Sequence, residues 1–164
     1  MSANNVLSIE NARIMFRNFS GKEGRFNPPG RRNFCVLIDN QTTANKLVED
    51  GWNVRYLKAR DVEDDDQPYL QVAVRFDNIP PKIVLISGNG KTVLGESEIS
   101  ILDWADISNV DLIIRPYNYD VNGKKGVKAY LKTMYVTIEE DEFEKKYYDA
   151  PDSASSSIQG DDYF

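Results

Sequence analysis

The stretch VDLIIRPYNYDVNGKKGVKAYLKTMYVTI, Val110 to Ile138, decides the fold of this chain. It predicts two long β-strands joined at Asn122-Gly123, because Asn and Gly both tolerate the positive φ angles of a two-residue hairpin turn. Successive side chains of a strand point to opposite faces. One face of the hairpin is therefore predicted to be buried: Val110, Leu112, Ile114, Pro116, Val127, Ala129 and Leu131.

The opposite face of the hairpin alternates rings with cations: Arg115, Tyr117, Tyr119, Lys128, Tyr130 and Lys132. A two-residue turn places Tyr117 opposite Lys128, and Arg115 opposite Tyr130. Bases stack on aromatic rings while cations follow phosphates, so such a face suits single-stranded nucleic acid. Ordinary cross-strand pairing on a solvated surface gives the same pattern. The hairpin alone does not decide between the two interpretations.

The N-terminal part predicts one long strand from Val6 to Phe19, with a bulge near Glu10-Asn11 where the apolar phase changes. Beyond the bulge, the predicted inward residues are Ala12, Ile14 and Phe16, and the predicted outward residues are Arg13, Met15, Arg17 and Phe19. The Gly- and Pro-rich segment Ser20–Arg32 then predicts a loop. Its cations, which include Arg31 and Arg32, suit either contact with a phosphate backbone or a solvated connection.

The middle of the chain predicts short strands and two short helices. The expected strands are 32–38, 52–60, 69–76 and 82–87, and the expected helices are 40–50 and 97–105. In the first helix Ala44, Leu47 and Val48 share a face, and Gly51 ends it. Ser97 is expected to cap the second helix, with Ile99 and Leu102 inward. Arg55 and Arg75 take the outward phase of their strands. A second bulge is expected near Thr133, where the apolar phase of the last strand changes.

Two segments imitate ligand-binding motifs. Asp61–Pro68 is rich in acids, but a calcium loop needs Gly where Asp66 stands and Glu where Val72 stands. Gly90-Lys91-Thr92 follows a strand, but a phosphate-binding loop needs Gly where Leu85 stands. We therefore expect a solvated acidic loop and a hairpin turn.

Composition argues against catalysis. The chain has no His and one Cys, Cys35, which lies in an apolar run. Triads, thiol nucleophiles and zinc sites built on His or paired Cys are thus excluded. We predict no catalytic residue, no metal and no cofactor. A single Cys also indicates a reducing compartment, and no apolar stretch approaches the roughly 18 residues of a membrane span.

Charge divides the chain into two parts. Residues 139–164 hold nine acids and two lysines, whereas residues 1–138 hold eighteen basic and seventeen acidic residues. Residues 1–60 alone hold ten basic and five acidic residues. Such asymmetry suggests polyanion binding by the body. We predict a domain at 1–138 and a largely disordered acidic protein-interaction tail at 139–164, which ends in Asp161, Asp162, Tyr163 and Phe164.

Together these features predict a mainly β protein, an OB-type (Greek-key) small barrel with one or two short helices. The chain resembles bacteriophage single-stranded DNA-binding proteins of OB fold. The segments that carry the resemblance are Phe26–Phe34, Gly51–Val54, Arg115–Tyr117, Gly126–Leu131 and Asp161–Phe164. Bacterial members end in Asp residues, an apolar-Pro pair and Phe, whereas here Tyr163 precedes Phe164 and Pro is absent.

The resemblance implies sequence-independent binding of single-stranded DNA in replication, recombination or repair. It also implies that the tail recruits replication or recombination proteins, such as a polymerase, helicase/primase or nuclease, and occupies the DNA groove when DNA is absent. The expected DNA-binding residues are Arg13, Arg17, Arg31, Arg32, Arg55, Arg75, Arg115, Tyr117, Tyr119, Lys128, Tyr130 and Lys132.

A homodimer is possible, no membrane partner is expected, and the expected location is the cytoplasm, that of the host bacterium if a phage encodes the chain. Three alternatives stay open: a protein-interaction adaptor, an RNA-binding module, and a nuclease using Asp61 to Asp66 with a metal.

Overall fold

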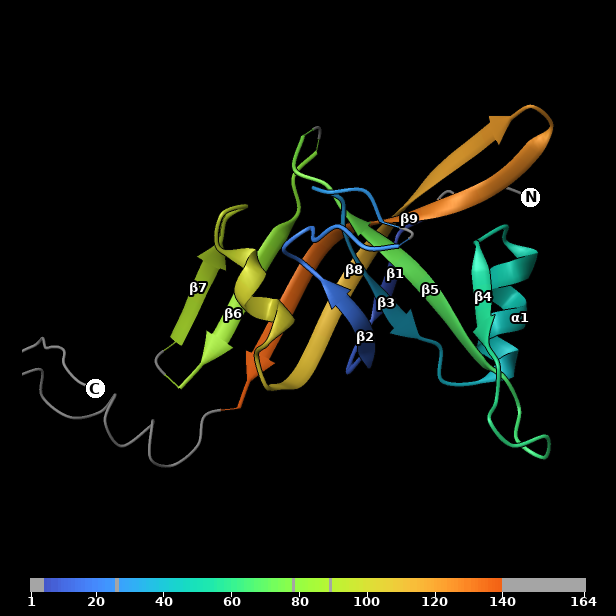
Figure 1. Ribbon diagram of the computed structural model, residues 1–164, viewed down its shortest axis with the longest axis horizontal. Helices are drawn as coiled ribbons and strands as arrows, with labels where there is room; N and C mark the ends of the chain where they lie inside the picture. Colours follow the sequence, from blue (N-terminus) through green and yellow to red (C-terminus); the bar gives the residue numbers. More distant parts are fainter. Residues whose placement is uncertain (1–4, 26, 78, 89, 140–164) are drawn as a thin grey trace, which may run out of the picture.

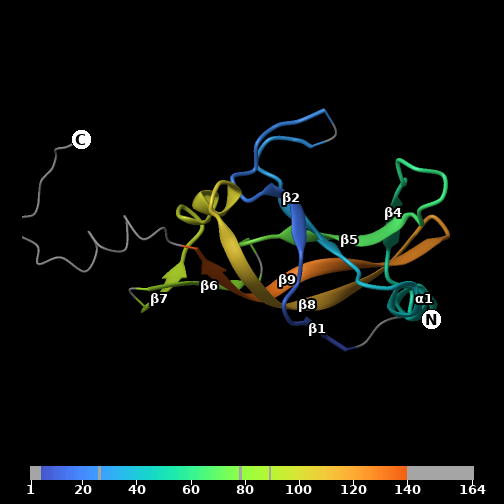
Figure 2. The same ribbon diagram turned by 90° about the horizontal axis from the view of Figure 1, so that it is seen from below.

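The structure is a computed structural model that describes residues 5–25, 27–77, 79–88 and 90–139 (Figure 1). Its strands are β1 Leu7–Ile9, β2 Ile14–Asn18, β3 Arg32–Leu37, β4 Val54–Leu57, β5 Gln67–Val74, β6 Lys82–Ser87, β7 Gly90–Leu94, β8 Ile107–Val121 and β9 Lys124–Ile138. Its helices are α1 Gln41–Glu49 and the 3-10 helix η1 Ile99–Asp103. Figure 2 shows α1 and η1 at opposite ends of the molecule.

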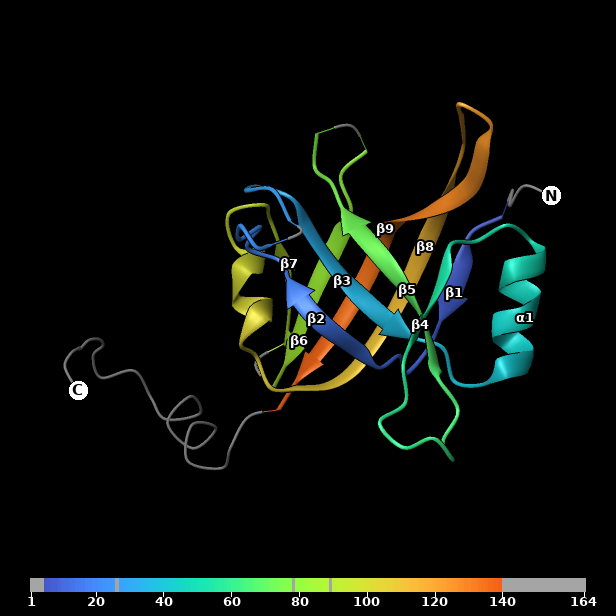
Figure 3. The ribbon, with the colours of Figure 1, turned by 45° about the vertical axis from the view of Figure 1, so that its right-hand side comes forward.

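The strands close into a ring. β1 pairs with β8, β2 with β3, β3 with β5, β5 with β9 in parallel, and β9 with β8. Between β1 and β2, the amide of Ala12 donates to the carbonyl of Val110 (2.7 Å), and the carbonyl of Arg13 accepts from the amide of Leu37 (2.9 Å). The bent β1–β2 segment therefore joins β8 to β3, and the predicted OB-type barrel is confirmed. In Figure 3, β3 and β5 cross in front of β8 and β9.

The β8–β9 hairpin has the predicted register. Asn122 and Gly123 form its turn with φ angles of 53° and 82°. Arg115 pairs with Tyr130 and Tyr117 with Lys128. The register then shifts, because Ile114 pairs with Leu131 but Ile113 pairs with Thr133. Lys132 is thus the extra residue of a bulge, close to its predicted position.

The prediction of one strand from Val6 to Phe19 is wrong. Asn11, at φ 52°, breaks the segment into β1 and β2, which have different partners. A further irregularity lies between Met15 and Asn18, where Phe16 has φ 53°. This shift reverses the predicted phase: Phe16 is 58% exposed, and Phe19 is fully buried against Phe34 with ring centroids 5.2 Å apart.

The helix predictions are confirmed in part. Asn40 caps α1 by accepting a hydrogen bond from the amide of Thr43 (2.8 Å). Ala44 and Leu47 are buried as predicted, whereas Val48 is exposed. The second helix is shorter than predicted and of 3-10 type, and it starts after Glu98 with no side-chain cap, so the expected Ser97 cap is wrong.

The apolar core fills the interior of the barrel and is built from strands all around it. It contains the predicted inward residues Val110, Leu112, Ile114, Val127, Ala129 and Leu131, together with Ile99 and Leu102 of η1. β4 pairs with β5 across the acidic loop, and β6 pairs with β7 as the predicted hairpin. No helix in the described ranges has the length and apolarity needed to cross a bilayer. Residues 140–164, most of the predicted tail, lie outside the described residues.

Candidate nucleic-acid interface

The outer face of the barrel sheet brings together side chains from four strands. Asn33 of β3 pairs with Ala73 of β5, Ala73 with Tyr130 of β9, and Tyr130 with Arg115 of β8. Because paired residues point to the same side of a sheet, these four form one row across it. Tyr117 pairs with Lys128 and lies in the neighbouring row.

Tyr130 lies at the centre of a cluster of rings and cations. Its ring centroid is 4.8 Å from Cζ of Arg115, 5.4 Å from Nζ of Lys128 and 5.9 Å from Cζ of Arg75. The ring of Tyr117 is 5.6 Å away at 48°. Tyr130 keeps only 8% of its surface exposed, whereas Tyr117 keeps 51%. The two predicted stacking rings therefore differ: Tyr130 anchors the cations through cation–π contacts, and Tyr117 is the ring open to solvent.

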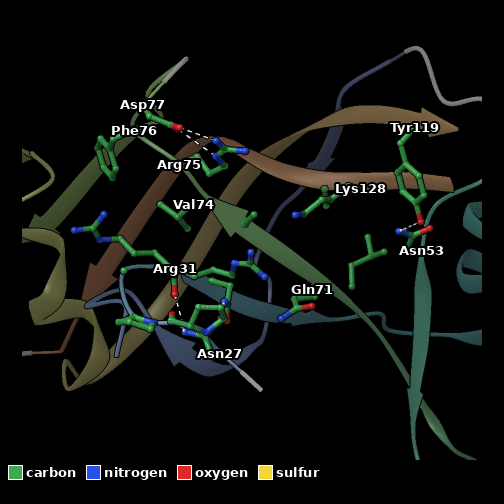
Figure 4. Close-up of a pocket in the computed structure, with 18 of the residues that line it drawn as sticks. Asn27, Arg31, Asn53, Gln71, Val74, Arg75, Phe76, Asp77, Tyr119 and Lys128 are labelled. Carbon is green, nitrogen blue, oxygen red and sulfur yellow. Dashed lines mark hydrogen bonds and ion pairs between the residues drawn. The ribbon is translucent and has the colours of Figure 1, made fainter. Parts of the chain in front are cut away.

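A groove of about 890 Å³ runs beside this cluster. Its walls come from the loop before β3, from β4 and β5, and from the β8–β9 hairpin. Figure 4 shows Arg75 and Lys128 on one side of β5, and Arg31 and Asn27 on the other. Five lining residues are cations, Arg31, Arg32, Arg55, Arg75 and Lys128, and two are acids, Asp77 and Glu96. The groove is therefore basic, which favours an anionic ligand.

The two acids neutralise particular arginines. Asp77 accepts from Arg75 at 2.6 Å, and Glu96 accepts from Arg32 at 2.8 Å. The hydrogen bond to Asp77, followed by one to Tyr130, raises the pKa of Arg75, and the same bond to Arg75 lowers the pKa of Asp77. In the described part of the chain, Arg31, Arg55, Arg115 and Lys128 have no ion-pair partner. Their charges remain available to a ligand.

One end of the groove is fixed by Tyr119. Its hydroxyl accepts a hydrogen bond from Nδ2 of Asn53 at 3.0 Å, and the amide of Asn53 donates to the carbonyl of Val127 at 3.1 Å (Figure 4). These bonds dock the hairpin onto the segment before β4. Gly126, paired with Tyr119, leaves room for this contact, because a Cβ there would lie 2.7 Å from Cζ of Tyr119 and 2.5 Å from Oδ1 of Asn53.

Three predicted site residues lie apart from the groove and the ring cluster. Arg17 is half-buried, and its Nη1 donates to the carbonyls of Leu102 (2.9 Å) and Ala105 (2.8 Å), so it joins β2 to η1. Arg13 is exposed in the connection between β1 and β2, and Lys132 is exposed at the bulge of β9. The predicted tail residues Asp161 to Phe164 lie outside the described residues.

Sequence reasoning missed the amides of the groove. Asn27, Asn33, Asn53 and Gln71 line it and provide donors and acceptors. Asn27 also holds the loop, because its Nδ2 donates to the carbonyls of Lys22 (2.9 Å) and Arg31 (3.0 Å). The outward phase of Gln71 was visible in the alternation of its strand. The role of Asn53 was not, since its partner Tyr119 is 66 residues away.

In the described residues, no group of three or more His, Cys, Asp or Glu side chains is placed to hold a metal ion. In the acidic loop Asp61–Asp66, the carboxylate of Asp61 accepts from the amide of Glu63 (3.2 Å). The carboxylate of Asp66 accepts from the amide of Ala59 (2.9 Å), which lowers the pKa of Asp66.

Comparison with solved structures supports the fold. The single-stranded DNA-binding protein from bacteriophage Enc34 in complex with ssDNA is 10% identical, with a TM-score of 0.55 over 83% of this chain and 88% of that chain. A second structure, of the single-stranded DNA-binding protein from bacteriophage Enc34, is 12% identical, with a TM-score of 0.53 over 83% of this chain and 82% of that chain. No curated protein sequence matched the chain.

A family model covers almost the whole chain. The family described as "Putative phage ssDNA-binding domain" matches residues 2–163. This match takes in the ring cluster, the basic groove and every other residue of the candidate interface. The chain therefore belongs to the phage ssDNA-binding domain family.

Proposed function

We propose that this protein binds single-stranded DNA, without catalysis and without sequence preference, on the outer face of its barrel. The observation that carries the proposal is the cluster around Tyr130, where three cations and the exposed ring of Tyr117 meet at the edge of a basic groove. Family membership and the fold shared with the Enc34 protein support the same function.

The chemistry of the surface favours single strands over duplexes. Bases of a single strand are free to stack on Tyr117, at roughly 1–3 kcal/mol per stacked base. Lys128, Arg115 and Arg31 would meet the phosphates. Stacking and phosphate contacts read no base identity, so the binding would be only weakly dependent on sequence. The predicted cations Arg55, Arg32 and Arg75 line the same groove, and Arg13 and Lys132 would extend the contact outside it.

The acidic tail adds a second function to the proposal. Residues 139–164 carry nine acids and two lysines and end on Tyr163-Phe164. A tethered polyanion competes for the groove at a high effective concentration. Displaced by DNA, the same tail would recruit replication or recombination proteins in the cytoplasm of a host bacterium.

Titration of a dye-labelled oligothymidine tests the proposal, with the full chain and with a variant lacking residues 149–164. We expect binding that weakens steeply with salt, and tighter DNA binding by the truncated variant. Absence of binding at low salt would contradict DNA binding and favour a protein-interaction adaptor. Weaker binding after truncation would contradict the competition by the tail. A labelled oligouridine in the same assay determines the preference between DNA and RNA.

A further inference from the structure

An exposed tryptophan lies outside the groove, at the junction of β2 and η1. Trp104 ends η1 and is 64% exposed. Ile101 of η1 is 46% exposed, and Phe16 of β2 is 58% exposed. We call Phe16, Ile101 and Trp104 the β2–η1 patch. Large apolar side chains exposed together mark an interaction site more often than isolated ones do.

Polar contacts join the two segments that carry the patch. Arg17 donates to the carbonyls of Leu102 and Ala105, on either side of Trp104. The carboxylate of Asp103 accepts from the amide of Phe19 (2.6 Å) and from the hydroxyl of Ser20 (2.7 Å). These contacts fix η1 against β2 on both flanks of Trp104. The indole of Trp104 is therefore exposed at the end of a helix whose position is fixed by hydrogen bonds.

Phe16 next to Arg17 is also held in an unfavourable conformation. Its φ of 53° is rare for a bulky residue and costs free energy. Such a conformation persists where the surroundings fix the backbone, as the anchoring of Arg17 and Phe19 does here. The chain thus keeps a second ring in solvent at this junction.

A cation accompanies the exposed indole. Nζ of Lys22 lies 4.9 Å from the ring centroid of Trp104. Lys22 belongs to the loop between β2 and β3, and its carbonyl accepts from Nδ2 of Asn27, which lines the groove. The same loop supplies Arg31 to the groove and leads into Arg32, the first residue of β3, which also lines it. One loop therefore spans from the groove to Trp104, and Figure 3 shows it beside η1.

We propose that Trp104 and Lys22 form a second nucleobase-binding site, which takes a base and its phosphate from the DNA strand that leaves the groove along this loop. This proposal rests on the proposed function and extends it: the bound strand would continue past Arg31 to the β2–η1 patch. The contact of a lysine with an aromatic ring repeats that of Lys128 with Tyr130 in the ring cluster. This contact favours a nucleotide over an apolar protein surface as the ligand. The amino group of Lys22 places a positive charge beside the ring on which a base would stack, and that charge suits the phosphate of the same nucleotide.

Intrinsic fluorescence provides the first test, since the chain has two tryptophans and Trp52 is buried at 6% exposure. An oligothymidine of about 16 nucleotides, the upper site size of one OB fold, is added to the full chain and to Trp104→Phe. We expect quenching in the full chain and little in Trp104→Phe. Binding detected by a labelled oligonucleotide without any quenching of Trp104 would overturn the second site and leave the groove proposal intact.

Affinity at two lengths provides the second test. Trp104→Ala should weaken binding of the 16-mer about tenfold, from the loss of one stacked base, and leave an oligothymidine of about 4 nucleotides unchanged. Trp104→Phe keeps a ring and should lose less affinity for the 16-mer than Trp104→Ala does. Lys22→Ala should weaken binding of the 16-mer and lower the salt dependence of that binding. Equal affinities of Trp104→Ala and the unmodified chain for the 16-mer would overturn the proposal and leave the patch to a protein partner. If the unmodified chain binds neither oligonucleotide, the proposed function and this site both fall.

Discussion

Arg115 lies directly opposite Tyr130 in the pairing of β8 and β9, and its Cζ lies 4.8 Å from the centre of the tyrosine ring. Arg115 has no acidic partner among the described residues, so the ring is what positions its charge. A cation placed by an aromatic ring keeps its charge unneutralised, whereas an ion pair would cancel it. This relationship supports our proposal that the outer sheet face binds phosphates.

Removal of Lys128 should lower the salt dependence of binding. For single strands, each phosphate contact adds about 0.7 to the slope of log affinity against log salt. We expect Lys128→Ala to lower that slope by about this amount, because Lys128 lines the groove and has no ion-pair partner among the described residues. Lys46→Ala, on the exposed side of α1 and outside the groove, is the matched control. Equal slopes for the two variants would contradict the role of Lys128.

Neutralisation of Asp77 should strengthen DNA binding. Its carboxylate bonds Arg75 at 2.6 Å and adds a negative charge to the groove. We expect Asp77→Asn to release Arg75 and to raise the affinity for oligothymidine several-fold. Asp65→Asn changes the net charge equally in a loop outside the groove. An equal gain in both variants, measured by the same titration, would mean that only net charge matters.

Gly126→Ala should loosen the hairpin. The added Cβ would lie 2.7 Å from Cζ of Tyr119 and separate its hydroxyl from Asn53. Overpacking of this kind costs about 1–3 kcal/mol, so thermal unfolding should occur at lower temperature and DNA affinity should fall. Gly24→Ala is the control, because its Cβ would meet only Cβ of Asn27 at 3.8 Å. An unchanged melting temperature for Gly126→Ala would show that the Tyr119–Asn53 contact is dispensable.

Cys35 should resist alkylation in the folded protein. Burial raises the pKa of its thiol to about 11, against an ordinary value of 9.0. The folded state therefore favours the neutral thiol, and this contribution to stability is complete below pH 9 and is lost as pH rises from about 9 to about 11. Iodoacetamide at pH 8 should label the urea-unfolded chain much faster than the folded one. The stability advantage of the unmodified chain over Cys35→Ala should also shrink across that pH range; fast labelling of the folded chain would contradict the burial.

The hairpin was predictable because its determinants are local. The Asn122-Gly123 turn and the period-2 alternation fix the register up to Ile114, and the change of apolar phase revealed the bulge at Lys132. The change of apolar phase also predicted an irregularity near Glu10-Asn11, but not that it would separate two strands with different partners. This separation arises because β1 and β2 bond two strands, β8 and β3, that barrel closure brings together.

The residue types of the candidate site could be predicted from the sequence better than their arrangement in space. Alternation gave Arg75, Arg115 and Lys128 the outward phase of their strands, but it did not show that Tyr130 would be buried, with Arg75 and Arg115 against its ring. Arg17 was predicted to point outward, as a residue that contacts a ligand would. The two carbonyl groups that accept its hydrogen bonds lie 85 and 88 residues away in the sequence. Such long-range partners leave no trace in local sequence.

The most direct test of the central claim compares two exposed tyrosines. Tyr117 is 51% exposed on the outer sheet face, and Tyr56 is 41% exposed on β4 outside the groove. In fluorescence anisotropy with labelled oligothymidine, Tyr117→Ala should weaken binding about 5- to 100-fold, as the loss of one stacked base implies. Tyr56→Ala should bind as the unmodified chain does. Equal losses in the two variants, or a larger loss for Tyr56→Ala, would contradict DNA binding on this face.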